Sequence, residues 1–162
     1  MYIRKAEIND LLIIMSIYEK AKQFMKNNGN PTQWGADYPN EEIVVRDISD
    51  GNLYVCIENN TIVGVFAFII GDEPTYQIIE NGAWHSSMQY GTIHRIASDD
   101  SIRGISRYCF DFCREKCNYL RIDTHRDNKP MLAAIQKYGF QECGIIHVRD
   151  GSERIAFDYL VN

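Results

Sequence analysis

Residues 91–140 read GTIHRIASDDSIRGISRYCFDFCREKCNYLRIDTHRDNKPMLAAIQKYGF, and this stretch decides the fold. It opens with the apolar-rich segment Gly91–Ser98, which predicts a strand. After a short polar turn, the segment Ser101–Lys116 predicts a helix, and Tyr119–Thr124 predicts a second strand. The segment Asn128–Tyr138 predicts a helix, because an asparagine can cap its start and a glycine follows its end.

The rest of the chain extends this unit in both directions. We expect a strand at 1–6, a helix that begins at Asn9 or Asp10, and a second helix capped by Asn40. Two hairpins are predicted, one turning at 59–60 and one at 150–151. Because hairpins and strand–helix–strand units occur together, the sequence predicts an α/β fold with a mixed sheet of about seven strands and about four helices.

Composition narrows the classes of protein to consider. The 162 residues carry 17 Lys and Arg against 22 Asp and Glu, a net charge of −5, which argues against nucleic acid as a partner. No apolar run approaches the ~20 residues that a membrane helix needs, so we expect no membrane association. Five cysteines without an export signal predict a cytoplasmic protein with free thiols. The length predicts one domain, residues 1–162.

A strand that passes through a glycine-containing turn into a helix can bind an anion. The first N–H groups of a helix lack partners within it, and the helix dipole places positive charge at that end. Gly104 would let the backbone approach a phosphate closely, and Arg103 would add a positive charge. The alternative interpretation is a tight turn with no ligand.

Two segments together resemble the GNAT superfamily of acyl-CoA-dependent N-acetyltransferases. The family motif Gln/Arg-x-x-Gly-x-Gly/Ala is similar to Ser101-Ile-Arg-Gly104-Ile-Ser106, and the later motif Asn-x-x-Ala-x-x-x-Tyr-x-x-x-Gly-Phe is similar to Asn128 through Gly139-Phe140. The order of the N-terminal strand and two helices also matches. The resemblance spans essentially the whole chain and implies a single GNAT domain with a splayed sheet, the acyl-CoA N-acyltransferase fold.

The resemblance implies a reaction and a cofactor site. The expected activity is transfer of an acetyl group from acetyl-CoA to a primary amine of a small molecule or peptide, by direct attack in a ternary complex and without a metal. Pantetheine would lie along the strand 92–97, and the pyrophosphate would bind the following turn. The residues that the resemblance assigns to the cofactor are Ile96, Ala97, Ser98, Ile102, Arg103, Gly104, Ile105, Ser106 and Asn128.

This sequence departs from the family pattern at several positions. Ser101 replaces the leading Gln or Arg, and Ser106 replaces the last small residue. Ile135 stands where many members carry the tyrosine that protonates the leaving thiolate. Tyr138 lies three residues further along, near the same helix face, and could act instead, or it could pack beside Phe140.

His94 is the other candidate catalytic residue. Side chains alternate along a strand, so His94 should share a face with Thr92 and Ile96 and look toward the cofactor. A histidine there could take a proton from the acceptor ammonium. The alternative is a core histidine that hydrogen-bonds the backbone. Arg95 would point the other way and serve the structure.

The acceptor site is expected near two aromatic residues. Trp34 and Tyr38 lie in the loop between the first two helices and could shape an amine pocket, or could equally cap the core. Acceptor specificity would come from 33–40, 72–90 and the final hairpin. Cys109, Cys113 and Cys117 repeat at helical spacing, and we interpret them as a packed apolar face rather than a metal site.

Two other classes of function remain open at this point. The substitution of Ile135 for tyrosine also fits a non-catalytic module that binds CoA or another ligand without turnover. A partner-binding scaffold, in which the turn at Gly104 is only structural, is the third. Edge strands of a mixed sheet could support a homodimer.

Overall fold

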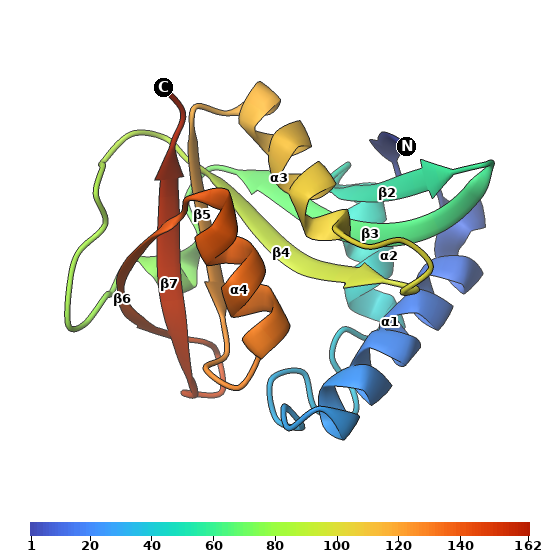
Figure 1. Cartoon of the computed structure of the whole chain (residues 1–162), viewed down its shortest axis with the longest axis horizontal. Helices are drawn as coiled ribbons and strands as arrows, with labels where there is room; N and C mark the ends of the chain where they lie inside the picture. The colour runs from blue at the N-terminus through green and yellow to red at the C-terminus, as the bar shows by residue number, and fades with distance from the viewer. The chain divides into compact units, whose positions relative to one another are not determined.

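The structure is a computed structural model that describes all residues from Met1 to Asn162 (Figure 1). Its seven strands form one mixed sheet in the order β1-β2-β3-β4-β5-β7-β6, with four α-helices. The predicted fold class is therefore confirmed. The elements are β1 Tyr2–Lys5, α1 Leu11–Asn27, α2 Glu41–Ser49, β2 Leu53–Glu58, β3 Thr61–Ile70, β4 Gly91–Ser98, α3 Ile105–Lys116, β5 Tyr119–Thr124, α4 Lys129–Tyr138, β6 Gln141–His147 and β7 Glu153–Leu160.

The chain divides into two compact units. The first unit comprises residues 1–68 and 94–109, and the second comprises 69–93 and 110–162. Strand β4 and helix α3 each contribute residues to both units. No helix of the chain combines the length and the apolar composition needed to span a membrane.

In the first unit, an antiparallel sheet of β1, β2 and β3 is covered on both faces. On one face Val55 and Val65 pack with Ile14 and Tyr18 of α1 and with Val44 of α2. On the other face the first turn of α3 lies against the sheet, where a Cβ added to Gly64 would stand 2.9 Å from Ile105 Cγ2. Burial on both faces explains why β3 is almost continuously apolar.

The local signals of the first unit behave as predicted. Asn59 and Asn60 both have positive φ, 50° and 62°, which suits the tight hairpin between β2 and β3. The side chain of Asn40 accepts a hydrogen bond from the Ile43 N–H at 2.9 Å and so caps α2.

In the second unit, β7 pairs antiparallel with both β5 and β6, and β5 pairs parallel with the first two residues of β4. An aromatic cluster joins the helices to the sheet. Phe110 of α3, Tyr138 of α4, Phe140 and Tyr159 of β7 have ring centroids 5.0–5.8 Å apart. This cluster and the left-handed Gly139 after α4 fix the α4–β6 connection.

The long loop 71–90 is held against β6 by two close backbone contacts. Glu80 and Ile145 exchange hydrogen bonds of 2.9 and 2.8 Å between their backbones. A Cβ on Gly82 would lie 1.8 Å from the Cys143 carbonyl oxygen, and one on Gly144 would lie 2.5 Å from the Glu80 carbonyl oxygen. Only glycine fits at these two positions, so the sequence allows this loop to lie directly on the sheet.

The predicted start of helix α3 is wrong by one turn. The sequence favoured a helix from Ser101, whereas α3 begins at Ile105. Asp100 and Gly104 have φ of 64° and 79°, which a right-handed helix cannot contain. Asp99 accepts hydrogen bonds from the backbone and hydroxyl of Ser101, and this local turn replaces the first helical turn.

Candidate active site

The most unusual backbone of the first unit lies in the middle of β4. Arg95 has φ of 53°, in the left-handed region that a residue with a bulky side chain seldom adopts. The buried Tyr18 hydroxyl donates to the Arg95 carbonyl at 2.9 Å. In a trans peptide the carbonyl and the following N–H point in opposite directions, so the Ile96 N–H points away from α1.

The Arg95 side chain is tied to the same side. Its Nε donates to Asp47 at 3.0 Å, its Nη2 lies 2.8 Å from that carboxylate, and its Nη1 donates to the Tyr38 hydroxyl at 2.8 Å. Burial raises the pKa of Asp47 despite the opposing effect of Arg95. These contacts agree with a structural role for Arg95, and they hold the loop of Tyr38 against β4.

His94 lies in the same charged environment. It is half-buried, and its charge acts on Asp47 to lower the pKa of that carboxyl, although burial has the larger and opposite effect. His94 and Arg95, adjacent in sequence, thus both influence one carboxylate. The left-handed residue interrupts regular alternation, so the predicted common face of Thr92, His94 and Ile96 does not follow from strand geometry alone.

The turn before α3 is open and polar. No hydrogen bond within the protein uses the backbone N–H groups of Ile102, Arg103 or Gly104. Gly104 is exposed, and a Cβ added there would meet no atom within 4 Å. Of the other predicted cofactor residues of this region, Ala97 and Ser98 are the last two residues of β4, and Ile105 and Ser106 are the first two of α3. The turn can accept an anion at its free amides.

Trp34 packs against the core of the first unit, with its ring 5.7 Å from that of Tyr18 and 6.4 Å from that of Tyr38. Tyr38 is 36% exposed and follows Trp34 in the same loop. The aromatic pair thus caps the core through Trp34 and presents Tyr38 at the surface beside Arg95.

The three predicted residues on or beside α4 have defined local roles. The Asn128 side chain accepts from the Met131 N–H at 3.2 Å and caps the helix. Ile135 is fully buried. The Tyr138 hydroxyl donates to Asp111 at 2.7 Å, and burial together with this bond raises the pKa of Tyr138 to about 12. These contacts favour the packing interpretation of Tyr138.

The second unit has a cavity that the sequence analysis did not find. It has a volume of about 560 Å³, and residues of loop 71–90 and β5 line it. Arg121 lies in its wall and is only 6% exposed. The one sequence signal was a charged residue inside the otherwise apolar segment Tyr119–Ile122. The lining residues are Gly71, Asp72, Tyr76, Gln77, Trp84, Ser87, Met88, Gln89, Tyr90 and Arg121.

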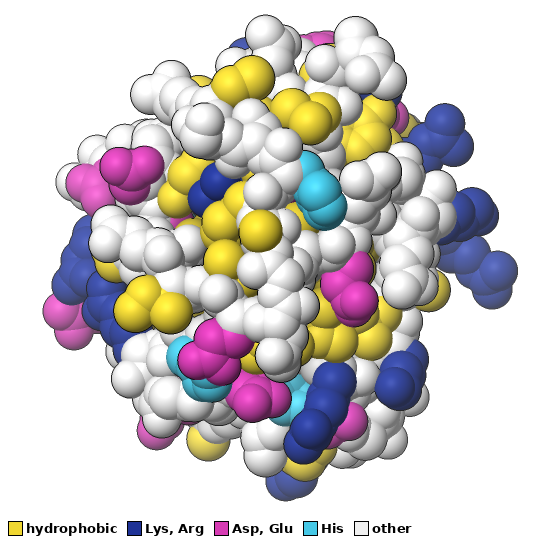
Figure 2. All heavy atoms as spheres, turned by 90° about the vertical axis from the view of Figure 1, so that its left-hand side faces the viewer, with side chains coloured by type: hydrophobic (Ala, Val, Ile, Leu, Met, Phe, Trp, Pro, Cys, Tyr) yellow, Lys and Arg dark blue, Asp and Glu magenta, His cyan; other side chains and the backbone are white.

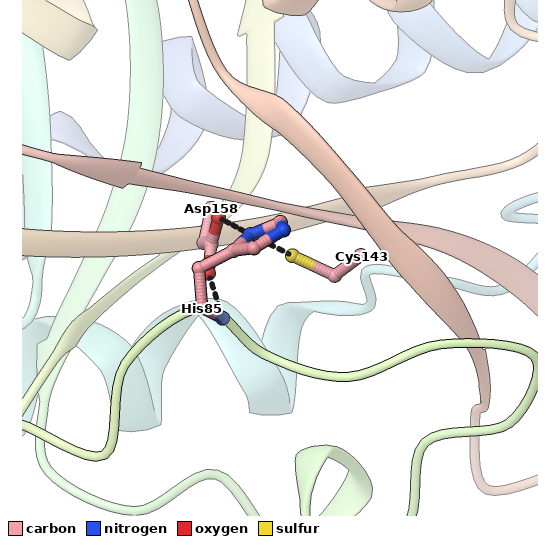
Figure 3. Close-up of side chains that lie close together, drawn as sticks. All are labelled: His85, Cys143 and Asp158. Carbon is pink, nitrogen blue, oxygen red and sulfur yellow. Dashed lines mark hydrogen bonds and ion pairs between the residues drawn. The ribbon is translucent and has the colours of Figure 1, made fainter.

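Beside the cavity wall, His85, Cys143 and Asp158 converge from the loop, β6 and β7 (Figure 3). His85 Nδ1 lies 2.7 Å from Asp158 Oδ1 and 3.4 Å from Cys143 Sγ. Both contacts use one ring nitrogen, so His85 cannot relay a proton from the thiol to the carboxylate. Burial raises the pKa of Cys143, which keeps the thiol protonated and a poor nucleophile.

The same three side chains offer ligand atoms within 4.8 Å of one another, so they are the residues best placed to hold a metal ion. The helical cysteines are arranged differently. Cys109 and Cys113 are fully buried and Cys117 is half-buried, and all five cysteines are free thiols. Their burial agrees with the predicted apolar face.

Comparison with known proteins identifies the family. No family model matches the sequence, and no curated protein matches it. Among solved structures, a GNAT-family acetyltransferase from Streptococcus agalactiae 2603 is 32% identical, with a TM-score of 0.91 over 99% of this chain and 95% of that one. A GNAT-family acetyltransferase from Listeria monocytogenes 4b F2365 is 18% identical, with a TM-score of 0.72 over 99% and 94%. The GNAT-like decarboxylase GphF in complex with isobutyryl-CoA is 14% identical, with a TM-score of 0.70 over 100% of both chains.

The two more distant structures share the fold. The structure from Streptococcus agalactiae is similar enough in sequence, over nearly the full length of both chains, to show common membership. The resemblance inferred from the motifs at Gly104 and Asn128 is thereby confirmed. This chain belongs to the GNAT family of acetyltransferases.

Proposed function

We propose that this protein transfers an acetyl group from acetyl-CoA to a primary amine of a small molecule or peptide, by direct attack in a ternary complex. Family membership supports acyl transfer as the class of reaction. The similar fold of GphF, whose structure contains isobutyryl-CoA, supports an acyl-CoA as the donor. The named relatives do not favour the alternative of a non-catalytic module.

The observation that carries the proposal is the open turn before α3. Three consecutive N–H groups, from Ile102 to Gly104, lack partners, and Gly104 leaves the backbone accessible. These backbone N–H groups have no acceptor within the protein. A diphosphate is doubly charged, and its oxygens can accept hydrogen bonds from several of them at once. Arg103 would add a charge-assisted contact, and Ile105 and Ser106 would continue the cradle into α3.

The thioester would bind beside the distorted part of β4. Tyr18 holds the Arg95 carbonyl, and this leaves the Ile96 N–H directed to the other side of the strand. An N–H fixed before the reaction can stabilise the oxyanion that develops on the thioester carbonyl. Ala97 and Ser98 would pair with the pantetheine arm, and Asn128 is predicted to contact the cofactor.

The chemical step needs a neutral amine. Its lone pair attacks the thioester carbonyl carbon, the C–S bond then breaks, and the thiolate of CoA departs with its electron pair. The nitrogen loses one proton, which we assign to His94 directly or through water. The thiolate gains one proton. Thiols have pKa values near 8.5, so this leaving group needs little assistance.

Tyr138 is the predicted proton donor to that thiolate, and its contribution should be small. Its hydroxyl already donates to Asp111, and its pKa of about 12 makes proton release unfavourable. Positioning of the two substrates would supply most of the rate enhancement. Trp34 and Tyr38 are predicted to border the acceptor.

The phosphate site can be tested by a charge change at Gly104. We expect Gly104→Glu to weaken acetyl-CoA binding by about tenfold or more relative to Gly104→Gln, because only the carboxylate repels the diphosphate. Both variants carry the same strain from the positive φ, so the pair isolates charge. Isothermal titration calorimetry measures both affinities.

Equal affinities in the two variants would contradict this phosphate site. A wild-type protein that binds no acetyl-CoA at millimolar concentration would remove the proposed donor altogether. Transfer itself is tested with a panel of primary amines by following release of free CoA thiol.

A further inference from the structure

Arg121 is a buried cation with no carboxylate partner. Its side chain lies in the wall of the cavity of about 560 Å³, and only 6% of the residue is exposed. No ion pair within the protein neutralises this buried charge. Its Nε donates to the Tyr119 hydroxyl at 3.3 Å and its Nη2 to the Ser86 carbonyl at 3.0 Å. Its Nη1 makes no hydrogen bond within the protein and its Nη2 makes only one, so three of its five N–H donors remain unused.

Aromatic rings compensate part of the cost of burying this charge. The guanidinium carbon lies 4.0 Å from the Trp84 ring centroid, 3.9 Å from that of Tyr90 and 5.1 Å from that of Tyr119. A guanidinium that packs on aromatic rings with its face keeps its N–H groups at the edge for hydrogen bonds. A ligand in the plane of the guanidinium could therefore bind at that edge.

The nearby carboxylates are already engaged with other donors. Asp158 accepts from the Tyr119 hydroxyl at 2.6 Å and from the His85 N–H at 2.8 Å, and its second oxygen contacts His85 Nδ1 (Figure 3). Asp123 accepts from the Tyr76 hydroxyl at 2.6 Å. Asp72 also lines the cavity and is exposed, but it forms no ion pair with Arg121.

The loop that carries Trp84 is built into this arrangement. The Trp84 indole N–H donates to the Tyr76 carbonyl at 3.0 Å, and the tight contacts of Gly82 and Gly144 hold the loop on β6.

Figure 2 shows the side of the molecule at the left of Figure 1, where hydrophobic, acidic and basic side chains are interspersed. Met88, 49% exposed, joins the cavity wall.

We propose that this cavity binds the carboxylate of a small molecule at Arg121. The ligand class is a small carboxylate that also carries an ammonium group, such as an amino acid. A carboxylate can accept two parallel hydrogen bonds from a guanidinium edge. Asp72 at the cavity wall would attract the ammonium of the same molecule.

The competing explanation is that Arg121 only fastens the loop through Ser86, Trp84 and Tyr90. Both explanations predict that substitutions at Arg121 reduce stability. Only the carboxylate site predicts that a free carboxylate changes the environment of Arg121 and Trp84. The experiment must therefore observe these residues in the folded protein.

The chain contains two tryptophans, Trp34 and Trp84, and this allows a direct test. The probe is N-acetylglycine, and N-acetylglycinamide of nearly the same shape is the neutral control. Both are added without acetyl-CoA to the ¹⁵N-labelled protein. We expect N-acetylglycine to shift the Arg121 Nε–H and Trp84 Nε1–H signals in a saturable manner, and to leave the Trp34 indole signal unchanged.

Variants then test the role of the guanidinium. Arg121→Met should weaken the affinity for N-acetylglycine by about tenfold or more. The affinity of Arg121→Lys should lie between those of the wild type and Arg121→Met, because an ammonium keeps the charge but lacks the planar fork of a guanidinium. Arg149→Met removes a positive charge from an exposed position outside the cavity. This control variant should bind N-acetylglycine with the affinity of the wild type. If Arg121→Met does not fold, the wild-type titration still decides the question.

Shifts that are equal for the acid and the amide, or absent with both, would overturn the carboxylate site. No transfer to any amine, with probe binding intact, would overturn the proposed function and leave the carboxylate site standing.

Discussion

At the scale of single residues, two buried arginines are stabilised in different ways. Arg95 meets the carboxylate of Asp47 and the hydroxyl of Tyr38, so its charge is neutralised inside the protein. Arg121 meets aromatic faces and a carbonyl, and its charge is left without a carboxylate. The difference suggests that Arg95 holds structure, whereas Arg121 can also hold a ligand.

Replacement of His94 tests the proposed proton acceptor. We expect His94→Ala to lower kcat by about a hundredfold or more, the usual contribution of a general base, with a smaller change in KM. Rates measured across pH should also lose the part of the profile that depends on deprotonation of the base. His125→Ala serves as a control histidine variant in the second unit.

Tyr138→Phe should reduce kcat much less than His94→Ala does, since the Tyr138 hydroxyl is bound to Asp111. A wild-type rate and pH profile in His94→Ala would reject His94 as the base. A larger effect of Tyr138→Phe than of His94→Ala would reverse the two assignments.

At the scale of elements, the loop 71–90 shows how glycine positions decide a contact. β6 carries a bulge between Glu142 and Gly144, so Cys143 is the extra residue in its register with β7. Gly82 of the loop lies directly against the Cys143 carbonyl. The bulge and the glycine together bring His85 close to Cys143 and Asp158, which are 58 and 73 residues away in sequence.

We expect Gly82→Ala to destabilise the protein by about 1–3 kcal/mol, because the added Cβ would stand 1.8 Å from a backbone oxygen that cannot rotate away. Ala83→Ser adds one atom at the neighbouring exposed position and should change stability by less than about 0.5 kcal/mol. Urea denaturation measures both. If the two variants unfold at the same midpoint, the loop does not lie on β6 as described.

At the scale of the whole molecule, stability should depend on pH through Asp158. Burial alone would raise the pKa of Asp158, but hydrogen bonds from the Tyr119 hydroxyl and from His85 outweigh burial and lower it. A carboxyl whose pKa is lower in the folded state stabilises the fold fully above its unfolded pKa, about 3.9. That contribution is lost as the pH falls through the folded pKa.

Asp158→Asn should therefore lower the melting temperature at neutral pH and make it fall less steeply below about pH 4 than in the wild type. Thermal melts followed by circular dichroism from neutral to acidic pH provide the comparison. Asp37→Asn is the exposed control and should melt as the wild type does at neutral pH. Parallel curves for Asp158→Asn and the wild type would show that Asp158 contributes nothing to the acid sensitivity.

Much of the fold could be predicted because its signals are local. The caps at Asn40 and Asn128, the hairpin asparagines 59–60 and the apolar run of β3 each act within a few residues. The start of α3 was missed because helical periodicity continues through Ser101, whereas the conformations of Asp100 and Gly104 stop it. The single domain, the cytoplasmic location, the homodimer and the catalytic residues stay predictions.

By itself, the sequence determined the order of the elements, because spacing and capping are properties of neighbouring residues, and two of its motifs resembled those of the family. Only the tertiary structure decided which distant side chains meet. Arg121, Trp84 and Asp158 come together through the order β5-β7-β6 and a loop held by two glycines. The left-handed Arg95 likewise depends on Tyr18 and Asp47, since contacts from outside the strand must stabilise a conformation that its own side chain disfavours.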